Sequence, residues 1–370
     1  MARAAILICI DGCGPEYLRD ARFIRHLGNE GFLSVGSSMI PSVTNVNNVS
    51  ILTGEYPEVH GITSNYYYDR ATGREVYMES PDFIRARTLL EVGADAGLKT
   101  ALLTSKDKLR SLLNRGAHIS FSAEAPPGWV VRRIGDPPHI YSVDVDIWLL
   151  KAAKEVVLRE SPDLMYVATT DYAMHKYAPQ HSEAKRHTRG IDEAIQELVE
   201  EVERHKDEFL ICITADHGMS DKRRAVNLEL VLREHGICSK LNPIIADRYT
   251  LHHMNLGGAV YIYLEDLMDL PRAIEVLRDT EGVEMVLTRK QASRRFHLDE
   301  ERIGDIMVLG RKDYVFGLLD EEVQDISLRS HGSLHEMKVP LIVNLPRSEI
   351  SEEPQENKDL AAIIVKWLIG

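Results

Sequence analysis

Short apolar runs bounded by polar residues recur along the chain. They span residues 4–10, 100–104, 164–169, 209–214 and 339–343. Strands that are buried on both faces of a parallel sheet read as continuous runs of this kind, without strict alternation. Segments of helical pattern separate each run from the next. The chain therefore predicts an α/β fold: a mostly parallel sheet covered by helices on both faces, a three-layer αβα core.

The clearest helical pattern covers residues 181–205. Its apolar positions recur at helical spacing among acidic and basic residues: Ile191, Ala194, Ile195, Leu198, Val199 and Val202. Such a stripe is typical of a helix that packs one face on a core. Residues 143–160 and 85–96 show a similar pattern, so we expect helices there as well.

The pattern of predicted elements changes near residue 221. Residues 258–264, 283–288 and 306–309 predict strands and residues 270–280 a helix, with no pair of candidate metal ligands among them. We interpret residues 221–317 as an inserted α+β cap lobe that covers the site and shapes specificity. Residues 1–220 and 318–370 would then form the metal-binding catalytic core.

Polar residues follow four of the predicted strands at the point where each strand ends. Asp11 follows the first, Lys106 and Lys108 the second, Asp171 the third, and the pair Asp216-His217 the fourth. Ligands of open α/β sheets bind beyond the carboxyl ends of the strands. Helix capping or turn formation explains one or two of these residues, but not all of them together. We expect the set to gather at one edge.

Composition limits the partners. The 370 residues carry a formal net charge of −13, which argues against nucleic acid or an anionic membrane as a general partner. An anionic substrate must therefore be attracted locally, by metal ions or by a few placed cations. Neither a signal peptide nor an apolar stretch of the ~20 residues needed for a membrane span is present. Four cysteines without zinc-finger or disulfide-scaffold spacing predict reduced thiols and a cytoplasmic protein.

The segment 41–54, Pro-Ser-Val-Thr-Asn-Val-Asn-Asn-Val-Ser-Ile-Leu-Thr-Gly, sets a hydroxyl at the start of a predicted helix. If Thr44 is the N-cap, the backbone N–H groups that follow point at the anion that the hydroxyl attacks. This arrangement suits a nucleophile in phosphoryl or phosphonyl transfer, provided that metal ions lower the pKa of the hydroxyl.

Two sets of candidate metal ligands accompany Thr44. Asp171 and His175 lie four residues apart, so a helical turn places both on one face, where they can reach a single ion. His331 would complete this site, with His335 as the rival. A neighbouring glycine, Gly332, favours His331, but the sequence leaves both open.

The second set surrounds the nucleophile. Asp11, Asp216, His217 and the Thr44 oxygen would hold another ion, because a charge at the end of so apolar a strand as 209–214 needs a partner. Mixed nitrogen and oxygen donors suit Zn²⁺, with Mn²⁺ or Fe²⁺ as alternatives.

In this order, Asp11-Gly, Thr44, Asp171-x-x-x-His175, Asp216-His217-Gly-Met and His331-Gly resemble the alkaline phosphatase superfamily. Within it they resemble the type I phosphodiesterase and nucleotide pyrophosphatase branch. The resemblance covers nearly the whole chain and implies an alkaline-phosphatase-like fold with two metal ions.

The segments 44–54, 57–62, 65–69 and 106–110 are similar to those of the phosphonoacetate hydrolases. That similarity implies zinc-dependent hydrolysis of the C–P bond of phosphonoacetate to acetate and phosphate. Thr44 would be the nucleophile, Asn65 would hold a phosphonyl oxygen, and Lys106 and Lys108 would bind the carboxylate of this small anionic phosphonate.

Two other functions remain open at this stage. The first is a metal-dependent phosphodiesterase or nucleotide pyrophosphatase that uses the same ligands, in which the two lysines would matter little. The second is a metal-stabilised binding protein without turnover. The intact set of candidate ligands and the threonine argue against it. A homodimer is also open.

Overall fold

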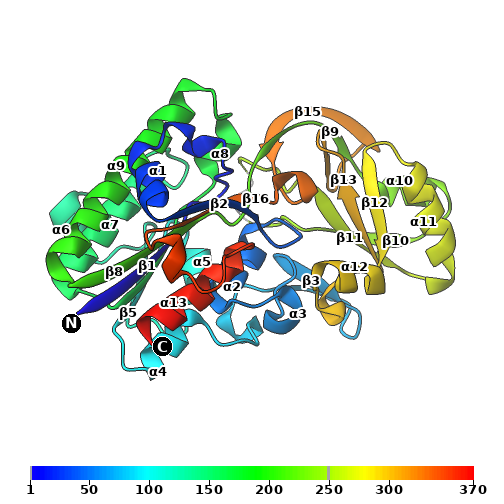
Figure 1. Ribbon diagram of the computed structural model, residues 1–370. Coiled ribbons are helices and arrows are strands. Elements are labelled where there is room, and N and C mark those ends of the chain that lie inside the picture. Colours follow the sequence, from blue (N-terminus) through cyan, green and yellow to red (C-terminus); the bar gives the residue numbers. More distant parts are fainter. Residues whose placement is uncertain (1, 248–250) are drawn as a thin grey trace.

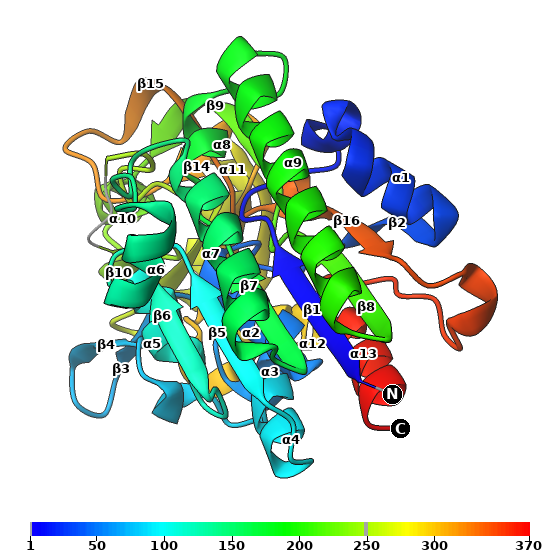
Figure 2. The same cartoon turned by 90° about the vertical axis from the view of Figure 1, so that its left-hand side faces the viewer.

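The computed structural model describes residues 2–247 and 251–370. Its centre is a seven-stranded sheet of order β2-β16-β8-β1-β7-β5-β6 (Figures 1 and 2). The strands are β1 (Arg3–Cys9), β2 (Phe32–Ser37), β5 (Thr100–Thr104), β6 (Ile119–Ser122), β7 (Leu164–Ala168), β8 (Glu208–Thr214) and β16 (Lys338–Val343). The five apolar runs of the sequence all form strands of this sheet, which confirms the predicted α/β core.

The direction of β16 differs from the prediction. Strands β8, β1, β7, β5 and β6 are parallel, whereas β16 runs antiparallel to both of its neighbours, β8 and β2. The chain enters β16 from the loop that carries His331, at the edge where the parallel strands end, so it must run back across the sheet. An apolar run shows burial but not direction, and the expectation of a parallel strand at 339–343 is therefore wrong.

Helices cover both faces of the sheet (Figure 2). One face carries α1 (Arg22–Glu30), α6 (Gly128–Ile134), α7 (Val145–Glu160) and α9 (Ser182–His205); the other carries α2 (Thr44–Thr53), α4 (Leu89–Asp95), α5 (Asp107–Leu113) and α13 (Leu360–Leu368). The apolar stripe of α9 is buried, as its spacing predicts.

Helix α4 begins four residues later than predicted. Thr88 caps it, because its side chain accepts from the Glu91 N–H while the Glu91 side chain accepts from the Thr88 N–H. This capping box fixes the start of the helix at Leu89.

A second group of elements lies beside the core (Figure 1). A four-stranded antiparallel sheet has the order β10-β11-β13-β12, and a three-stranded sheet the order β14-β9-β15. Their strands are β9 (Ser220–Val226), β10 (Ser239–Pro243), β11 (Ala259–Leu264), β12 (Val283–Thr288), β13 (Ile306–Gly310), β14 (Tyr314–Phe316) and β15 (Val323–Ser330). The helices are α10 (Leu228–Glu234), α11 (Leu270–Asp279) and α12 (Arg289–Phe296).

The predicted strands and helix of the cap lobe are thus present, and its limits of 221–317 remain a prediction. Strand β15 pairs antiparallel with β9, so the smaller sheets extend as far as Ser330. The polar sequence of β15, half exposed in the structure, gave no strand signal.

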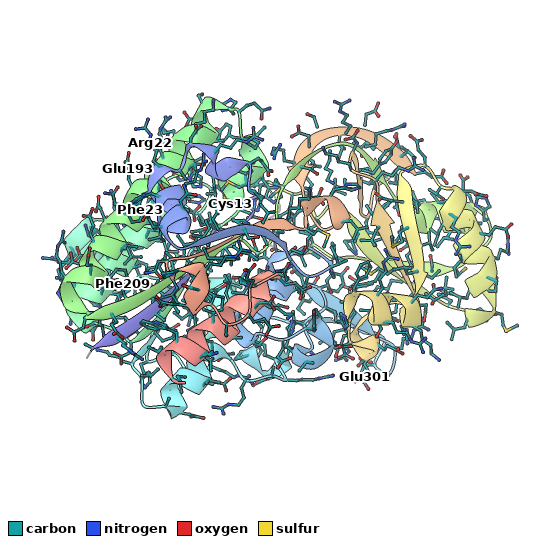
Figure 3. The ribbon with its side chains drawn as sticks, in the orientation of Figure 1. Cys13, Arg22, Phe23, Glu193, Phe209 and Glu301 are labelled. Atoms are coloured by element: carbon teal, nitrogen blue, oxygen red, sulfur yellow. The ribbon has the colours of Figure 1, made fainter. Side chains whose placement is uncertain are left out.

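One of the two apolar faces of the four-stranded sheet joins these parts. Tyr261, Met307 and Leu309 on one face of the four-stranded sheet belong to the main hydrophobic core, whereas Val260 and Ile262 pack into a separate one. Side chains fill the space between the layers: Cys13 lies inside, while Arg22 and Glu193 lie at the surface (Figure 3). Among the described residues, no helix has the length and apolar character that a bilayer crossing requires.

The remaining elements near the site are a short helix, α3 (Pro57–His60), a hairpin of β3 (Tyr66–Asp69) and β4 (Arg74–Tyr77), and α8 (Tyr172–Lys176). The ring of Tyr66 stacks on that of Tyr77 at 5.0 Å. This stacking packs the two strands of the hairpin against each other.

Candidate two-metal site

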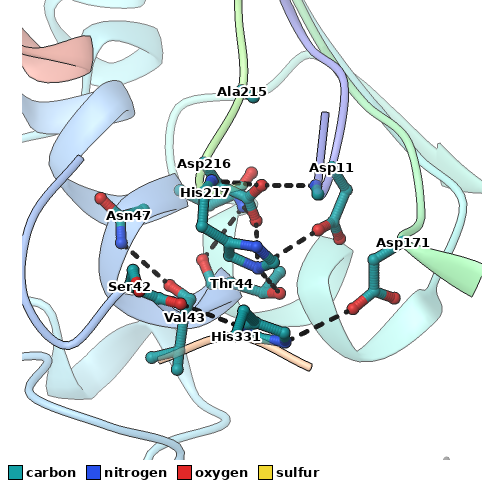
Figure 4. A network of polar contacts seen from close by, with 12 residues as sticks. Asp11, Ser42, Val43, Thr44, Asn47, Asp171, Ala215, Asp216, His217 and His331 are labelled. Atoms are coloured by element: carbon teal, nitrogen blue, oxygen red, sulfur yellow. Dashed lines mark hydrogen bonds and ion pairs between the residues drawn. The ribbon is translucent and has the colours of Figure 1, made fainter. Parts of the chain in front are cut away.

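The carboxyl ends of three adjacent parallel strands bring three buried aspartates together (Figure 4). Asp11 follows β1, Asp171 follows β7 and Asp216 follows β8, with exposed fractions of 1%, 3% and 0%. The Gly12 N–H donates to Asp216 Oδ1 over 3.0 Å, which links two of these strand ends. The predicted convergence of polar residues at one sheet edge is therefore present.

The first cluster consists of Asp11, Asp216 and His217, whose candidate ligand atoms lie within 4.8 Å of one another. His217 Nε2 is 3.5 Å from Asp11 Oδ1 and 3.5 Å from Asp216 Oδ2. The same nitrogen lies 3.3 Å from Thr44 Oγ1, so the predicted nucleophile stands beside this cluster.

The second cluster consists of Asp171, His175 and His331. Asp171 directly precedes helix α8, so His175 lies one turn later on the same face and places Nε2 3.0 Å from Asp171 Oδ2. His331 Nε2 lies 3.8 Å from the same oxygen. His335 instead places Nε2 2.6 Å from Glu284 Oε2, so the structure brings His331 and not His335 into the cluster.

Gly332 allows this placement of His331. Its φ is +117°, and an added Cβ would lie 3.0 Å from the Gly258 nitrogen and 2.5 Å from Ile244. A side chain at this position would push the loop away from the site.

All three histidines are oriented in the same way. The Nδ1 atoms of His175, His217 and His331 lie 2.6, 2.9 and 2.8 Å from the carbonyl oxygens of Arg329, Gly218 and Ser42. An Nδ1–H that donates to a carbonyl leaves the Nε2 lone pair facing the site. Lone pairs of nitrogen and carboxylate oxygen then converge, and a cation bound between them would remove their repulsion.

The electrostatics of Asp11 fit the same conclusion. Neither carboxylate oxygen of Asp11 has a hydrogen-bond partner among the described residues. Burial, followed by the charges of Asp171 and Asp216, raises the pKa of Asp11 well above its usual value. A buried carboxylate without donors is costly unless it is paired or coordinates a metal, so the donor sets fit two divalent ions.

Other charges stabilise Asp171 in its ionised form. Burial pushes its pKa upward, but the charge of Lys106, followed by the neighbouring His175, outweighs burial and holds the pKa well below its usual value. Burial and then the nearby His217 and His175 lower the pKa of His331, which keeps its ring neutral. A neutral imidazole and an ionised carboxylate are the forms that bind metal.

Thr44 is not the N-cap of its helix. Val43 is the cap residue, and α2 begins at Thr44 itself. A capping oxygen would accept from a backbone N–H of the first turn, whereas Thr44 Oγ1 instead faces His217 Nε2. The prediction of a capping role is therefore wrong, but the predicted position of the hydroxyl at the helix start is confirmed.

Asn47 and Asn48 hold the turn around Thr44. Asn47 Oδ1 accepts from the Met39 N–H over 2.7 Å, and Asn48 Nδ2 donates to the Thr44 carbonyl over 3.0 Å and to Asp216 Oδ2 over 3.3 Å. Both residues thus satisfy backbone groups around the nucleophile turn, and Asn48 also contacts the first cluster.

A cleft opens beside the two clusters. Its lining includes Thr44, Asn45, Asn65, Lys106, Lys108 and Asp247. Lys106 Nζ lies 2.9 Å from Asp171 Oδ1, and Lys108 Nζ lies 3.0 Å from Glu79 Oε1 and 3.6 Å from Asp247 Oδ2. The two lysines and Asn65 thus share the cleft with the hydroxyl, as the sequence predicted.

Comparison with known proteins agrees with this geometry. Residues 5–334 match the type I phosphodiesterase / nucleotide pyrophosphatase family. The chain belongs to this family. It thereby joins the metal-dependent hydrolases of the alkaline phosphatase superfamily, and its fold is that of the superfamily.

One solved relative matches over almost the full length of both chains. Phosphonoacetate hydrolase from Sinorhizobium meliloti 1021 in complex with phosphonoacetate is 34% identical, with a TM-score of 0.90 over 99% of this chain and 96% of that chain. The same enzyme with phosphonoformate is 35% identical, with a TM-score of 0.88 over the same shares of both chains.

More distant relatives share the fold. Murine ectonucleotide pyrophosphatase / phosphodiesterase 5 has a TM-score of 0.72 at 16% identity, over 99% of this chain and 95% of that chain. An uncharacterised pyrophosphatase/phosphodiesterase of Schizosaccharomyces pombe is 27% identical over 192 residues, which are 49% of this chain and 36% of that protein. The chain thus spans about a third of this curated relative.

Several residues of this family member's site were not found from the sequence. Glu79 and Asp247 contact Lys108, and His253 Nε2 lies 3.2 Å from Asp247 Oδ1. Burial alone would raise the pKa of Asp247, but the His253 hydrogen bond and the Lys108 charge hold it below its usual value. These contacts depend on how the loop between β10 and β11 folds over the core, which no local pattern reveals.

Two further side chains stand out. The side-chain nitrogen of Asn45, buried at 5% exposure, has no hydrogen-bond partner among the described residues and belongs to the cleft lining. The other is His252, which lies beside Asp171. A pair of adjacent histidines in a loop was the available signal.

Proposed function

We propose that this protein hydrolyses the carbon–phosphorus bond of phosphonoacetate to acetate and phosphate, with Thr44 as the nucleophile and two Zn²⁺ ions. The observation that carries the proposal is one cleft that is lined by Thr44, by two lysines and by Asp171 and His331 of the second cluster. The Thr44 hydroxyl also lies 3.3 Å from His217 of the first cluster. The 34% identity to phosphonoacetate hydrolase over 99% of the chain supports it.

We assign one ion to Asp11, Thr44, Asp216 and His217, and the other to Asp171, His175 and His331. When bound, zinc lowers the pKa of a coordinated hydroxyl or water and neutralises charge on the phosphonyl oxygens. Mn²⁺ or Fe²⁺ would also accept these nitrogen and oxygen donors.

Thr44 attacks phosphorus from the first position of helix α2. The backbone N–H groups of the first turn are free of helical partners and face an anion at this end. The side chains of Asn45 and Asn65 line the same cleft and act as donors to phosphonyl oxygens. Such preorganised donors stabilise the charge that develops in the transition state. The O–P bond to Thr44 forms as the P–C bond breaks, which leaves a phosphothreonine, and water then hydrolyses this ester to release phosphate.

Cleavage of the carbon–phosphorus bond leaves an electron pair on carbon. The carboxylate of phosphonoacetate accepts it as an enediolate, which takes a proton to become acetate. Lys106 and Lys108 place ammonium groups against this end of the substrate. Because negative charge on the carboxylate grows during the reaction, the lysines bind the transition state more strongly than the ground state.

When substrate binds, Lys108 exchanges a protein carboxylate for the carboxylate of the substrate. In the structure its ammonium group lies between Glu79 and Asp247, and a substrate carboxylate would replace one of these contacts. Lys106, held by Asp171, links the second cluster to the same end of the cleft.

The test is a panel of phosphonoacetate, phosphonopyruvate, a phosphate monoester and a diester with zinc-loaded protein. Phosphonoacetate should have the highest kcat/KM, and Lys106→Ala and Lys108→Ala should lower it. Lys99→Ala is the matched control. Lys99 directly precedes β5, at the end of the strand opposite the site, and pairs with Glu160. A diester that reacts as well as phosphonoacetate, with no dependence on the lysines, would instead indicate a phosphodiesterase.

A further inference from the structure

His252 is a buried imidazole next to the second ligand cluster. It lies in the segment between β10 and β11 and is 6% exposed. Neither of its ring nitrogens has a hydrogen-bond partner among the described residues. Its Nε2 lies 3.5 Å from Asp171 Oδ1, slightly beyond normal hydrogen-bond length. A buried polar ring in this state calls for a partner.

The two oxygens of Asp171 face different groups. Oδ2 lies 3.0 Å from His175 Nε2 and 3.8 Å from His331 Nε2, within the ligand cluster. Oδ1 instead lies 2.9 Å from Lys106 Nζ and 3.5 Å from His252 Nε2. Two nitrogen groups therefore lie near Oδ1, whereas the two histidines of the cluster lie near Oδ2.

Aromatic contacts hold the His252 ring in place. Its centroid lies 4.7 Å from the His175 ring, 5.7 Å from Tyr141 and 6.0 Å from Tyr172, all in edge-to-face arrangements. These contacts come from core elements, whereas His252 comes from the segment that joins two strands of the smaller sheet. The ring therefore joins the smaller lobe to the second cluster.

We infer that His252 is a positioning residue for the second metal ion: its Nε2–H donates to Asp171 Oδ1 and, with Lys106, leaves only Oδ2 for the metal. A carboxylate fixed in this way binds one ion through one oxygen, in a set orientation. This inference rests on the proposed two-metal site, but not on phosphonoacetate as the substrate.

The test compares His252→Phe, which keeps a ring and removes the donor, with His252→Gln, which restores an N–H donor. Zinc occupancy of both sites is measured by chelator competition without substrate, and the spectrum of the Co²⁺-substituted protein reports ligand geometry. We expect His252→Phe to release one of the two ions ~10–100-fold more readily with an altered cobalt spectrum. His252→Gln should fall between His252→Phe and the unaltered protein.

His335→Phe is the matched control, because His335 pairs with Glu284 outside the cluster and should leave both signals unchanged. Equal metal retention and equal spectra for His252→Phe and the unaltered protein would overturn the inference. So would a His252→Gln variant that loses the ion as readily as His252→Phe, which would indicate ring packing alone.

A second comparison is needed if the His252→Phe variant fails to fold. In that case, retention of the second metal ion by His252→Ala is measured with and without added imidazole. If imidazole does not restore retention of this ion, the inference is overturned. Because no substrate is present, failure of phosphonoacetate turnover and failure of this inference are separate results.

Discussion

A buried carboxyl behind the site provides a quantitative prediction. Asp146, in α7, is 1% exposed, and its Oδ1 accepts from Ser105 Oγ and from the Thr170 N–H, each over 2.8 Å. These two donors directly precede Lys106 and Asp171. Asp146 therefore joins the end of β5 to the end of β7 and sets the spacing of two site residues.

Burial, opposed by these hydrogen bonds and the Lys106 charge, raises the pKa of Asp146 from 3.8 to about 7. In the unfolded chain the Asp146 carboxyl loses its proton near pH 4. In the folded protein it keeps the proton until about pH 7. Between these values the folded state binds more protons, so stability falls as pH rises. At 1.36 kcal/mol per pH unit, the full loss is about 4 kcal/mol, and about 2–3 kcal/mol of it develops between about pH 5 and pH 8.

Asp146→Asn keeps the oxygen acceptor and removes the ionisation. Its free energy of unfolding, relative to that of the unaltered protein, should therefore rise by about 2–3 kcal/mol from about pH 5 to pH 8. Urea unfolding of metal-depleted protein measures this without the pH dependence of metal binding. A difference that stays constant over this range would refute the assigned pKa.

Three further predictions concern the site. Thr44→Ala should abolish turnover while thermal unfolding and the content of both metals change little. Lys108→Ala should lower kcat/KM for phosphonoacetate by about 10²–10³, as does loss of one transition-state donor, with a smaller effect on a phosphate monoester; equal effects on both would contradict a carboxylate-binding role. His331→Ala should lose the second metal in an elemental analysis, whereas His335→Ala should retain it, and the reverse pattern would reassign the ligand.

Much of the site could be predicted because its residues lie just beyond the carboxyl ends of strands, where open α/β sheets bind ligands. Asp11, Asp171 and Asp216 follow short apolar runs within two residues, and parallel strands deliver their carboxyl ends to one edge. Asp171 and His175 required only helical spacing. Local pattern and the topology that it implies are therefore enough to gather most of the candidate ligands.

The remaining features depend on long-range packing. His331 and His335 lie in one loop, and only the path of that loop past Ser42 and Gly258 separates them. The backbone geometry that makes Val43 the cap leaves no trace in residue type. Asp247 and His252 reach the core from between two strands of another sheet, so their contacts have no local signature.

The central claim is cleavage of a carbon–phosphorus bond at this site. Phosphorus NMR of zinc-loaded protein with phosphonoacetate, combined with an assay for acetate, tests it most directly. We expect the unaltered protein to form equal amounts of phosphate and acetate, and Thr44→Ala to form neither. Unchanged phosphonoacetate in the presence of fully metal-loaded protein, alongside rapid hydrolysis of a phosphodiester, would contradict it.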